Sequence, residues 1–254
     1  MVRRRVIILL LLAISTAAQA RAQHLADERS RREAIQFYRT GLEFFSAERF
    51  DRAAEEFTKA TEKDPLFTLA HYQAGQSYMN LKRFASAIKA FKECLESTRE
   101  LYALAETNRF EVEKHRDDEI REMRESVDRL AAMARKNPNS GGYQAMMMRA
   151  EQHLHDLENQ RPSLSSGYRP PAEVLLSLGS AYYRTDQLEA AEAEWKAAIE
   201  SNPKLGEAHN NIAVVYMQTG RLDLAEQELK LAEKNGFRVN PQFKTDLKNA
   251  RGHK

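Results

Sequence analysis

The stretch GQSYMNLKRFASAIKAF, from Gly75 to Phe91, decides the fold of this 254-residue chain. Gly75 and Tyr78 lie three residues apart, and after a polar break Ala87 and Phe91 lie four apart. Spacings of three and four place side chains on one face of a helix. The stretch therefore predicts two helices joined by a short turn, each with a packing face that carries a small residue and an aromatic one.

The same pattern recurs with a period of 34 residues. One period earlier, the matching positions are Gly41, Phe44, Phe50, Ala53, Phe57 and Ala60. Further copies are Gly179, Tyr182, Leu188, Ala191, Trp195 and Ala198, followed by Ala213, Tyr216, Leu222, Ala225, Leu229 and Ala232. Four copies at a fixed period of this size indicate an array of helical repeats. A single helical hairpin cannot bury both of its faces, so the units must stack.

These residues resemble the tetratricopeptide repeat (TPR), a helix-turn-helix unit of 34 residues. Asp64-Pro65 and Asn202-Pro203 stand where that repeat ends its second helix with a proline, and residues 208–211 open a helix as in many family members. Arg99 and Phe237 replace the closing proline in the second and fourth units, and Ala213 replaces the glycine. The resemblance covers residues 34–67, 68–99, 172–205 and 206–237. It implies an all-α repeat solenoid made of two TPR pairs, at 24–99 and 172–237.

The first twenty residues have the pattern of a secretory signal. Arg3 to Arg5 precede an apolar run from Val6 to Ile14, and Ala18-Gln19-Ala20 fits the small-x-small pattern that signal peptidase accepts. The run is shorter than the roughly 20 apolar residues that a membrane span needs. We therefore predict a cleaved signal at 1–20 and export to the periplasm or the extracellular space of a bacterium. An uncleaved signal would instead tether the protein to the membrane.

The charge of the mature chain argues against nucleic-acid binding. Removal of residues 1–20 takes away three arginines and no acidic residue, so the formal net charge changes from +2 to −1. The remaining charges are interspersed and form no basic block of the kind that concentrates nucleic acid. Cys94 is the only cysteine. Stability must therefore come from packing and not from an intramolecular disulfide.

About 70 residues separate the second and third repeats, because Gly75 and Gly179 lie 104 residues apart where one period would be 34. No proline or glycine occurs from Ala85 to Asn137. The second helix of unit two is therefore expected to continue as one long helix, or as two nearly collinear ones. Its charged middle contains Asp117, Asp118 and Glu119, which we read as a solvated helix face.

Residues 100–161 further predict an antiparallel helical hairpin. Its two apolar seams are Ile120, Met123, Val127, Leu130 and Ala134, then Tyr143, Met147, Ala150, Leu154 and Leu157. The break between them, residues 137–142, is rich in Asn, Pro and Gly. The hairpin is either a structural spacer or an arm for docking or homo-oligomerisation. A Pro- and Ser-containing linker at 162–171 returns to the repeats, and Phe243, Leu247 and Ala250 form one stripe of a capping helix within 238–254.

The sequence contains no recognisable catalytic motif, so we predict that the protein is not an enzyme and needs no cofactor. It has no phosphate-binding glycine loop, nucleophile elbow or zinc-protease helix. His153 and His155 lie two apart, which on a helix points them about 200° apart, so they cannot chelate one metal ion.

TPR arrays bind peptides or protein segments in the concave groove lined by the first helix of each unit, and the resemblance implies such a groove here. The candidate residues lie on the first helices, off the face that packs within each unit. They are Tyr38, Leu42, Phe45, Tyr72, Gln76, Met79, Leu176, Ser180, Tyr183, Asn210, Val214 and Met217. Alternatively, the long helix or the N-terminal residues occupy the groove of the first pair.

The sequence thus favours an exported, non-enzymatic scaffold or assembly factor with a protein or peptide partner. Two other hypotheses stay open: a structural homo-oligomer formed through the central hairpin, and a membrane-tethered accessory subunit of an envelope complex.

Overall fold

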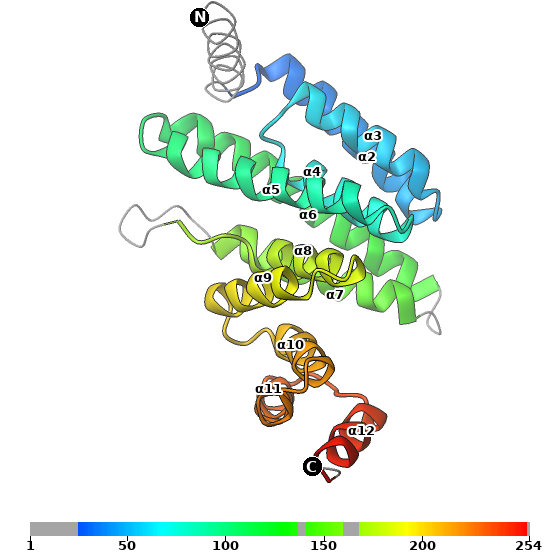
Figure 1. Ribbon diagram of the computed structural model, residues 1–254. Helices are drawn as coiled ribbons and strands as arrows, with labels where there is room; N and C mark the ends of the chain where they lie inside the picture. Colours follow the sequence, from blue (N-terminus) through cyan, green and yellow to red (C-terminus); the bar gives the residue numbers. More distant parts are fainter. Residues whose placement is uncertain (1–24, 137–140, 160–167, 253–254) are drawn as a thin grey trace, which may run out of the picture.

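A computed structural model of the protein describes residues 25–136, 141–159 and 168–252. Within these ranges every regular element is an α-helix (Figure 1). The predicted signal at 1–20 and most of the predicted linker at 162–171 lie outside the described residues.

Four helix-turn-helix units form the array. The first repeat pair consists of α2 (Glu28–Ser46), α3 (Phe50–Lys63), α4 (Thr68–Asn80) and α5 (Phe84–Ala105). The second repeat pair consists of α8 (Ala172–Arg184), α9 (Leu188–Ser201), α10 (Gly206–Gln218) and α11 (Leu222–Lys234). The predicted all-α repeat fold is confirmed.

The turn inside each unit uses a left-handed residue at one fixed position. Glu48, Lys82 and Asp186 have φ values of 57°, 57° and 59°, and Gly220 has 73°. This conformation costs a non-glycine residue on the order of 1 kcal/mol. Its recurrence at one repeat position shows that the packing of the two helices imposes it.

Within each unit, a small residue of the first helix receives a large side chain of the second. The glycine–aromatic pairs are Gly41–Phe57, Gly75–Phe91 and Gly179–Trp195. A Cβ added to any of these glycines would come within 2.6 Å of the ring. In the fourth unit, Ala213 stands at the glycine position and Leu229 at the aromatic position. In this unit, the slightly larger residue on the first helix is therefore matched by a smaller residue on the second helix.

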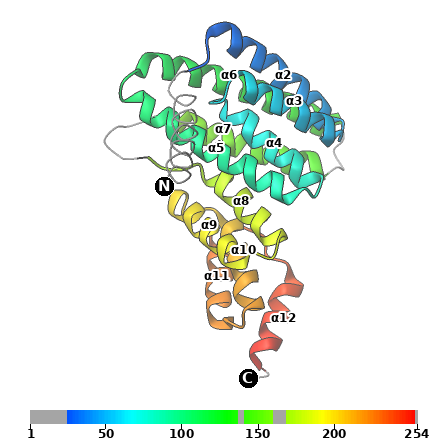
Figure 2. The same ribbon diagram turned by 45° about the horizontal axis from the view of Figure 1, so that its top comes forward.

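The two repeat pairs form one continuous stack. Helix α8 packs directly against α5, and one buried cluster joins Tyr72, Phe91 and Cys94 to Val174 and Leu178 across this junction. Figures 1 and 2 show α8 to α11 continuing away from the broader N-terminal part. The insertion therefore leaves the array and returns to it without separating the second and third units.

The helix that begins at Phe84 ends at Ala105, which corrects the prediction of one long or two collinear helices. The backbone N–H groups of Thr107 and Asn108 both donate to the Leu104 carbonyl, which closes the turn. The next helix, α6 (Arg109–Lys136), folds back along the first repeat pair. Because residues 106–108 contain neither proline nor glycine, only the packing of α6 on the repeats reveals this break.

Helices α6 and α7 (Gly141–Asn159) lie side by side and are called the inserted pair here. Arg116 donates to the Leu157 carbonyl, and Arg124 donates to Glu158 at 2.7 Å, so the C-terminal end of α7 lies beside the middle of α6. On α7, His153 is buried while His155 is exposed.

The inserted pair packs over the first repeat pair. Met123 of α6 is 1% exposed and belongs to the same buried cluster as Tyr38 and Phe57. Leu154 of α7 packs against this cluster, and the His153 ring lies 4.8 Å from the ring of Tyr72. The apolar seams of the inserted pair thus contact the chain's own repeats.

The last helix, α12 (Pro241–Gly252), lies against α11 at the end of the array. Leu247 is buried, and Phe243 and Ala250 are partly buried against the same cluster. Arg251 donates to Asp223 of α11 at 2.7 Å. This helix covers apolar surface that a fifth repeat would otherwise cover.

The match between the small and the large residue can be tested by double-mutant analysis. Gly75→Ala should crowd Phe91, Phe91→Leu should leave a gap, and the double variant should reproduce the pairing of the fourth unit. We expect the double variant to be about 1–2 kcal/mol more stable than the sum of the single effects. Urea unfolding of the four proteins measures this coupling, and simple additivity would contradict the packing argument.

Burial lowers the pKa of His153 to about 4. Between about pH 6.5 and pH 4, the unfolded chain binds a proton at this position that the folded chain does not. The free energy of unfolding should therefore fall as the pH falls through this window, by up to about 3 kcal/mol from this residue. His153→Phe should remove that part of the pH dependence.

Urea unfolding at pH 7, 6 and 5 measures the effect. His155→Phe is the matched control, because it removes an exposed histidine of the same helix. Equal slopes for the wild type and His153→Phe would show that His153 does not stay neutral in the folded state.

Candidate protein-binding groove

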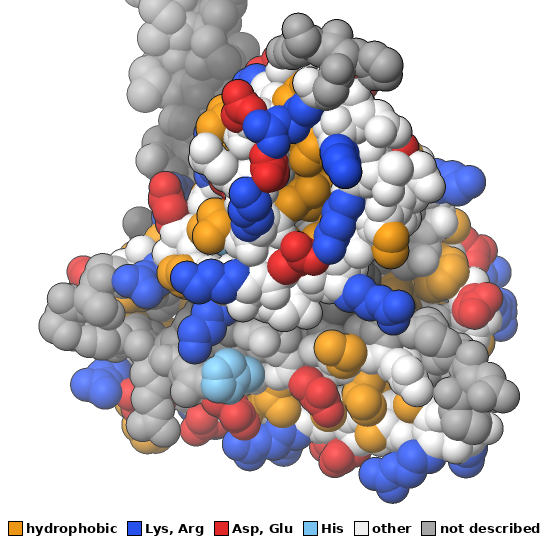
Figure 3. Space-filling model, turned by 90° about the horizontal axis from the view of Figure 1, so that it is seen from below, with side chains coloured by type: hydrophobic (Ala, Val, Ile, Leu, Met, Phe, Trp, Pro, Cys, Tyr) orange, Lys and Arg blue, Asp and Glu red, His pale blue; other side chains and the backbone are white. Residues whose placement is uncertain are grey.

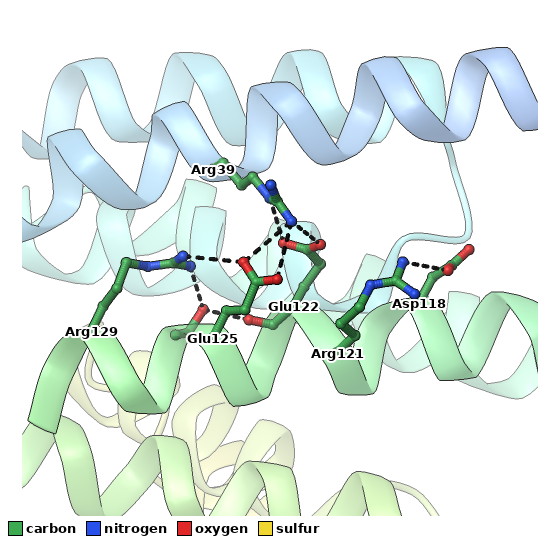
Figure 4. A network of polar contacts seen from close by, with 7 residues as sticks. Arg39, Asp118, Arg121, Glu122, Glu125 and Arg129 are labelled. Carbon is green, nitrogen blue, oxygen red and sulfur yellow. Dashed lines mark hydrogen bonds and ion pairs between the residues drawn. The ribbon is translucent and has the colours of Figure 1, made fainter.

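In the first repeat pair, the face formed by α2 and α4 is covered by the inserted pair. Arg39 of α2 donates from Nε to Glu122 Oε2 at 2.8 Å and from Nη2 to Glu122 Oε1 at 2.7 Å. Glu122 is 1% exposed, so this bidentate ion pair lies at the edge of a buried seam. The same arginine reaches Glu125, at 3.2 Å (Figure 4).

A second set of polar contacts joins α6 to the start of α4. The Thr68 backbone N–H donates to Glu119 Oε1 and the Thr68 hydroxyl donates to Glu119 Oε2, both at 2.7 Å. No other side chain caps α4, since Phe67 occupies its N-cap position. Glu119 therefore supplies from the insertion the acceptor that the first turn of α4 requires.

His115 completes this buried polar layer. Its Nε2 lies 2.8 Å from Oδ2 of Asp64, the residue that precedes the repeat-ending Pro65. Burial acts to lower the pKa of His115, but the hydrogen bond to Asp64 and the charges of Glu119 and Asp64 outweigh it and raise that pKa. Burial raises the pKa of Glu119 as well. The hollow beside these groups measures only about 10 Å³, which is too small for a substrate.

Glu119 corrects the expectation of a solvated acidic face. Asp117 is exposed and Asp118 half-buried, but Glu119 is only 4% exposed. The reason is the turn at residues 106–108, which lays one face of α6 on the repeats. One signal was available in the sequence, because Glu119, Glu122 and Ser126 share the helix face of Met123. Polar residues on an apolar seam indicate specific partners.

Three of the predicted groove residues are buried, so they are closed to a ligand while the inserted pair is in place: Tyr38 and Tyr72 lie beneath that pair, and Leu176 lies in the cluster that spans the two repeat pairs. Tyr38 is fully buried, with its ring 5.6 Å from Phe57 and 5.0 Å from Phe67. Tyr72 lies between Phe91 and His153, and Leu176 is 5% exposed. They share one repeat position, whose side chain points toward the inserted pair or the neighbouring units.

The other predicted residues are half-buried. In the first repeat pair they are Leu42, Phe45, Gln76 and Met79. Leu42 and Phe45 pack against the buried cluster beneath the inserted pair, and Met79 packs against the cluster that spans the two repeat pairs. Gln76 Nε2 donates to Ser177 Oγ of α8 at 3.0 Å, across the junction between the pairs. These contacts leave the first repeat pair little apolar surface for a partner.

The second repeat pair keeps more of the predicted surface available. Its partly exposed members are Ser180, Tyr183, Asn210, Val214 and Met217. The two helices that carry them are linked by a hydrogen bond from Gln218 Nε2 to the Tyr183 hydroxyl, at 2.6 Å. Helices α8 and α10 therefore present a surface with an aromatic, two aliphatic and several amide or hydroxyl groups. Such a mixture suits an extended or helical peptide.

The surface charge is mixed in sign. On the face seen from below in Figure 3, lysine and arginine side chains are interspersed with acidic and apolar ones. In the described ranges, no three His, Cys, Asp or Glu side chains are grouped so that they could hold a metal ion. None of the described helices is long and apolar enough to cross a membrane.

A wider hollow of about 420 Å³ lies on the outer side of the inserted pair. Its lining residues are Arg109, Glu113, Arg116, Asp117, Ile120, Arg121, Arg124 and Glu158. Three of its four arginines pair with carboxylates of the chain, Arg109 with Glu113, Arg121 with Asp118 and Arg124 with Glu158, and Arg116 donates to the Leu157 carbonyl. The hollow therefore offers an anion no unpaired cationic site.

Comparison with known proteins agrees with this architecture. A family model described as tetratricopeptide repeat matches residues 38–100 and 176–236, and so skips the inserted pair. Comparison with curated proteins found no match.

Similar solved structures include PilW, described as a widely conserved type IV pilus biogenesis factor, at 15% identity and a TM-score of 0.40 over 86% of each chain. A thermophilic TPR protein of Thermus thermophilus is 17% identical, with a TM-score of 0.34 over 85% of this chain and 98% of that one. YrrB, described as a TPR protein with an unusual peptide-binding site, is 17% identical, with a TM-score of 0.30 over 88% and 94%.

Four units with a 34-residue period, the recurring pairing of a small and a large residue, and the family match over both repeat pairs lead to one conclusion. The chain is a tetratricopeptide-repeat protein in its two repeat pairs, over residues 38–100 and 176–236.

Proposed function

We propose that the protein is an exported, non-enzymatic scaffold or assembly factor of a bacterial envelope. It binds a peptide or protein segment along the concave surface of its second repeat pair. The observation that carries the proposal is the contrast between the two pairs. The inserted pair covers the first, whereas α8 and α10 keep Tyr183, Val214 and Met217 partly exposed.

Export is inferred from the N-terminal sequence. Three arginines, a short apolar run and Ala18-Gln19-Ala20 form the pattern of a cleaved signal. The chain's single cysteine, Cys94, is buried, which suits an oxidising compartment because no exposed thiol is left to cross-link.

The alternative functions receive less support. A homo-oligomer through the inserted pair would need its apolar seams to face outward, but Met123, Leu154 and Leu157 pack on the first repeat pair. A membrane-tethered accessory subunit requires an uncleaved signal. We therefore keep the scaffold as the proposed function.

Site-specific photo-cross-linking in cells tests the groove. A photoreactive phenylalanine analogue at position 214 should give a discrete cross-linked band, because this position lies in the proposed groove. The same analogue at position 224 should give none, because Leu224 is exposed on α11, outside the groove.

Tyr183→Ala combined with Met217→Ala should reduce the band at least about fivefold while the helical content is unchanged, since both side chains are only partly buried. Leu224→Ala is the matched control. A band of equal strength at positions 214 and 224, or one that the double variant does not weaken, would refute the groove.

Export makes a separate prediction. The mature protein recovered from the cell envelope should begin at Arg21, after cleavage behind Ala20. N-terminal sequencing or intact-mass measurement checks this. A protein that retains residues 1–20 would favour the membrane-tethered alternative.

A further inference from the structure

We propose that the inserted pair is a displaceable internal ligand. In the structure the inserted pair occupies the α2–α4 face of the first repeat pair. An acidic, amphipathic helix of a partner protein displaces it and binds that face instead. This inference concerns the covered half of the array and does not depend on the groove of the second repeat pair.

The first reason is that the array does not need the inserted pair for its continuity. Helix α5 packs directly on α8, and the cluster containing Phe91 and Val174 continues through this junction. The inserted pair instead contributes Met123, Leu154 and Leu157 to a cluster on the α2–α4 side. It therefore lies on the repeats as a bound segment would, and its departure leaves the stack of units connected.

The second reason is the polar character of the contact. In Figure 4, Arg39 points from α2 to Glu122 and Glu125 on α6. Glu119, one turn earlier, accepts two hydrogen bonds from Thr68 at the start of α4. Carboxylates thus meet a guanidinium group and a helix N-terminus, both of which attract anions.

The third reason is that the seam is incompletely satisfied. Among the described residues, the buried side-chain nitrogens without a hydrogen-bond partner are Arg31 Nε and Nη1, His115 Nδ1 and His153 Nδ1. Arg31 Nη1 keeps only a longer ion pair, 3.7 Å from Asp118 Oδ2. All of these nitrogens lie where the inserted pair meets the first repeat pair. Buried polar atoms left without a hydrogen bond weaken an interface. This weakness distinguishes the seam from the interfaces between repeats and favours exchange for a better-matched segment.

The face that the inserted pair exposes when it leaves determines which chemical groups the partner helix must carry. A replacing helix needs one large apolar side chain to fill the site of Met123. It also needs carboxylates at the positions of Glu119 and Glu122, to satisfy Thr68 and Arg39. Because the inserted pair is tethered to the array, it competes at high effective concentration, so a partner gains access only when it binds this face more tightly.

A peptide with the sequence of residues 112–130 serves as the probe, because it carries this pattern in a separate molecule. The fluorescently labelled peptide is titrated into the full chain and into its Glu122→Arg variant, with anisotropy as the readout. Glu122→Arg places two cationic groups together and should loosen the inserted pair. We expect the peptide to bind this variant at least about tenfold more tightly than the wild type.

Charge exchange shows whether the peptide occupies the proposed face. The peptide with Glu122→Arg should bind the Arg39→Glu chain and not the Glu122→Arg chain. The chain with both Arg39→Glu and Glu122→Arg should restore the internal contact and exclude both peptides. Arg52→Glu, which removes an exposed ion pair with Glu55 on α3, is the matched control and should behave as the wild type.

Hydrogen exchange gives an independent readout of opening. In the Glu122→Arg chain, the amides of α6 and α7 should exchange at least about tenfold faster, with those of α8 to α11 unchanged. If circular dichroism shows that Glu122→Arg does not fold, Glu122→Gln is used in its place. The proposal would be overturned if the peptide fails to bind the folded variant, or if the charge exchange at positions 39 and 122 leaves peptide binding unchanged. Tyr183→Ala should leave peptide binding unchanged, which separates this test from that of the second repeat pair.

Discussion

The contact between a glycine of one helix and an aromatic ring of the next sets the geometry on which the rest of the molecule depends. Because Gly75 has no side chain, the ring of Phe91 lies directly against the first helix, and the same contact recurs at Gly179 and Trp195. Repetition of this contact gives each unit the same helix spacing. Units of equal shape can stack through equal interfaces, so a buried core extends along the array.

Stacking of this kind tolerates a long insertion. The interface between α5 and α8 is complete, and the chain between them is free to pack elsewhere provided that it returns. Here it packs back on the α2–α4 face, where Met123 enters the core and Glu122 pairs with Arg39. The first helices of the two halves of one solenoid are therefore covered to different extents, although their repeats are built alike.

This asymmetry organises the functional interpretation. A uniform array would offer one long groove, whereas the inserted pair leaves the face of α8 and α10 as the proposed binding surface. The covered half carries the buried layer of Asp64, His115 and Glu119, a set of contacts specific enough to act as a latch between the insertion and the repeats. His115 Nδ1 in this layer lacks a hydrogen-bond partner, so the layer is not an optimised core.

Local rules in the sequence determined the repeats. The 34-residue period, the positions of Gly75 and Phe91 and the apolar stripe of Leu247 were all readable, because helix packing within one unit depends on residues close in sequence. The turn at residues 106–108 could not be predicted from the sequence, which indicated the burial of Glu119 only through the helix face that it shares with Met123, and the covering of Tyr38 and Tyr72 only as one of two alternatives. They depend on contacts between residues far apart in the chain, such as Thr68–Glu119 and Arg39–Glu122, which are separated by 51 and 83 positions. Helical periodicity tells which face of α6 is apolar, but only the tertiary structure decided that this face lies on the first repeat pair, because that choice is made by packing between distant segments.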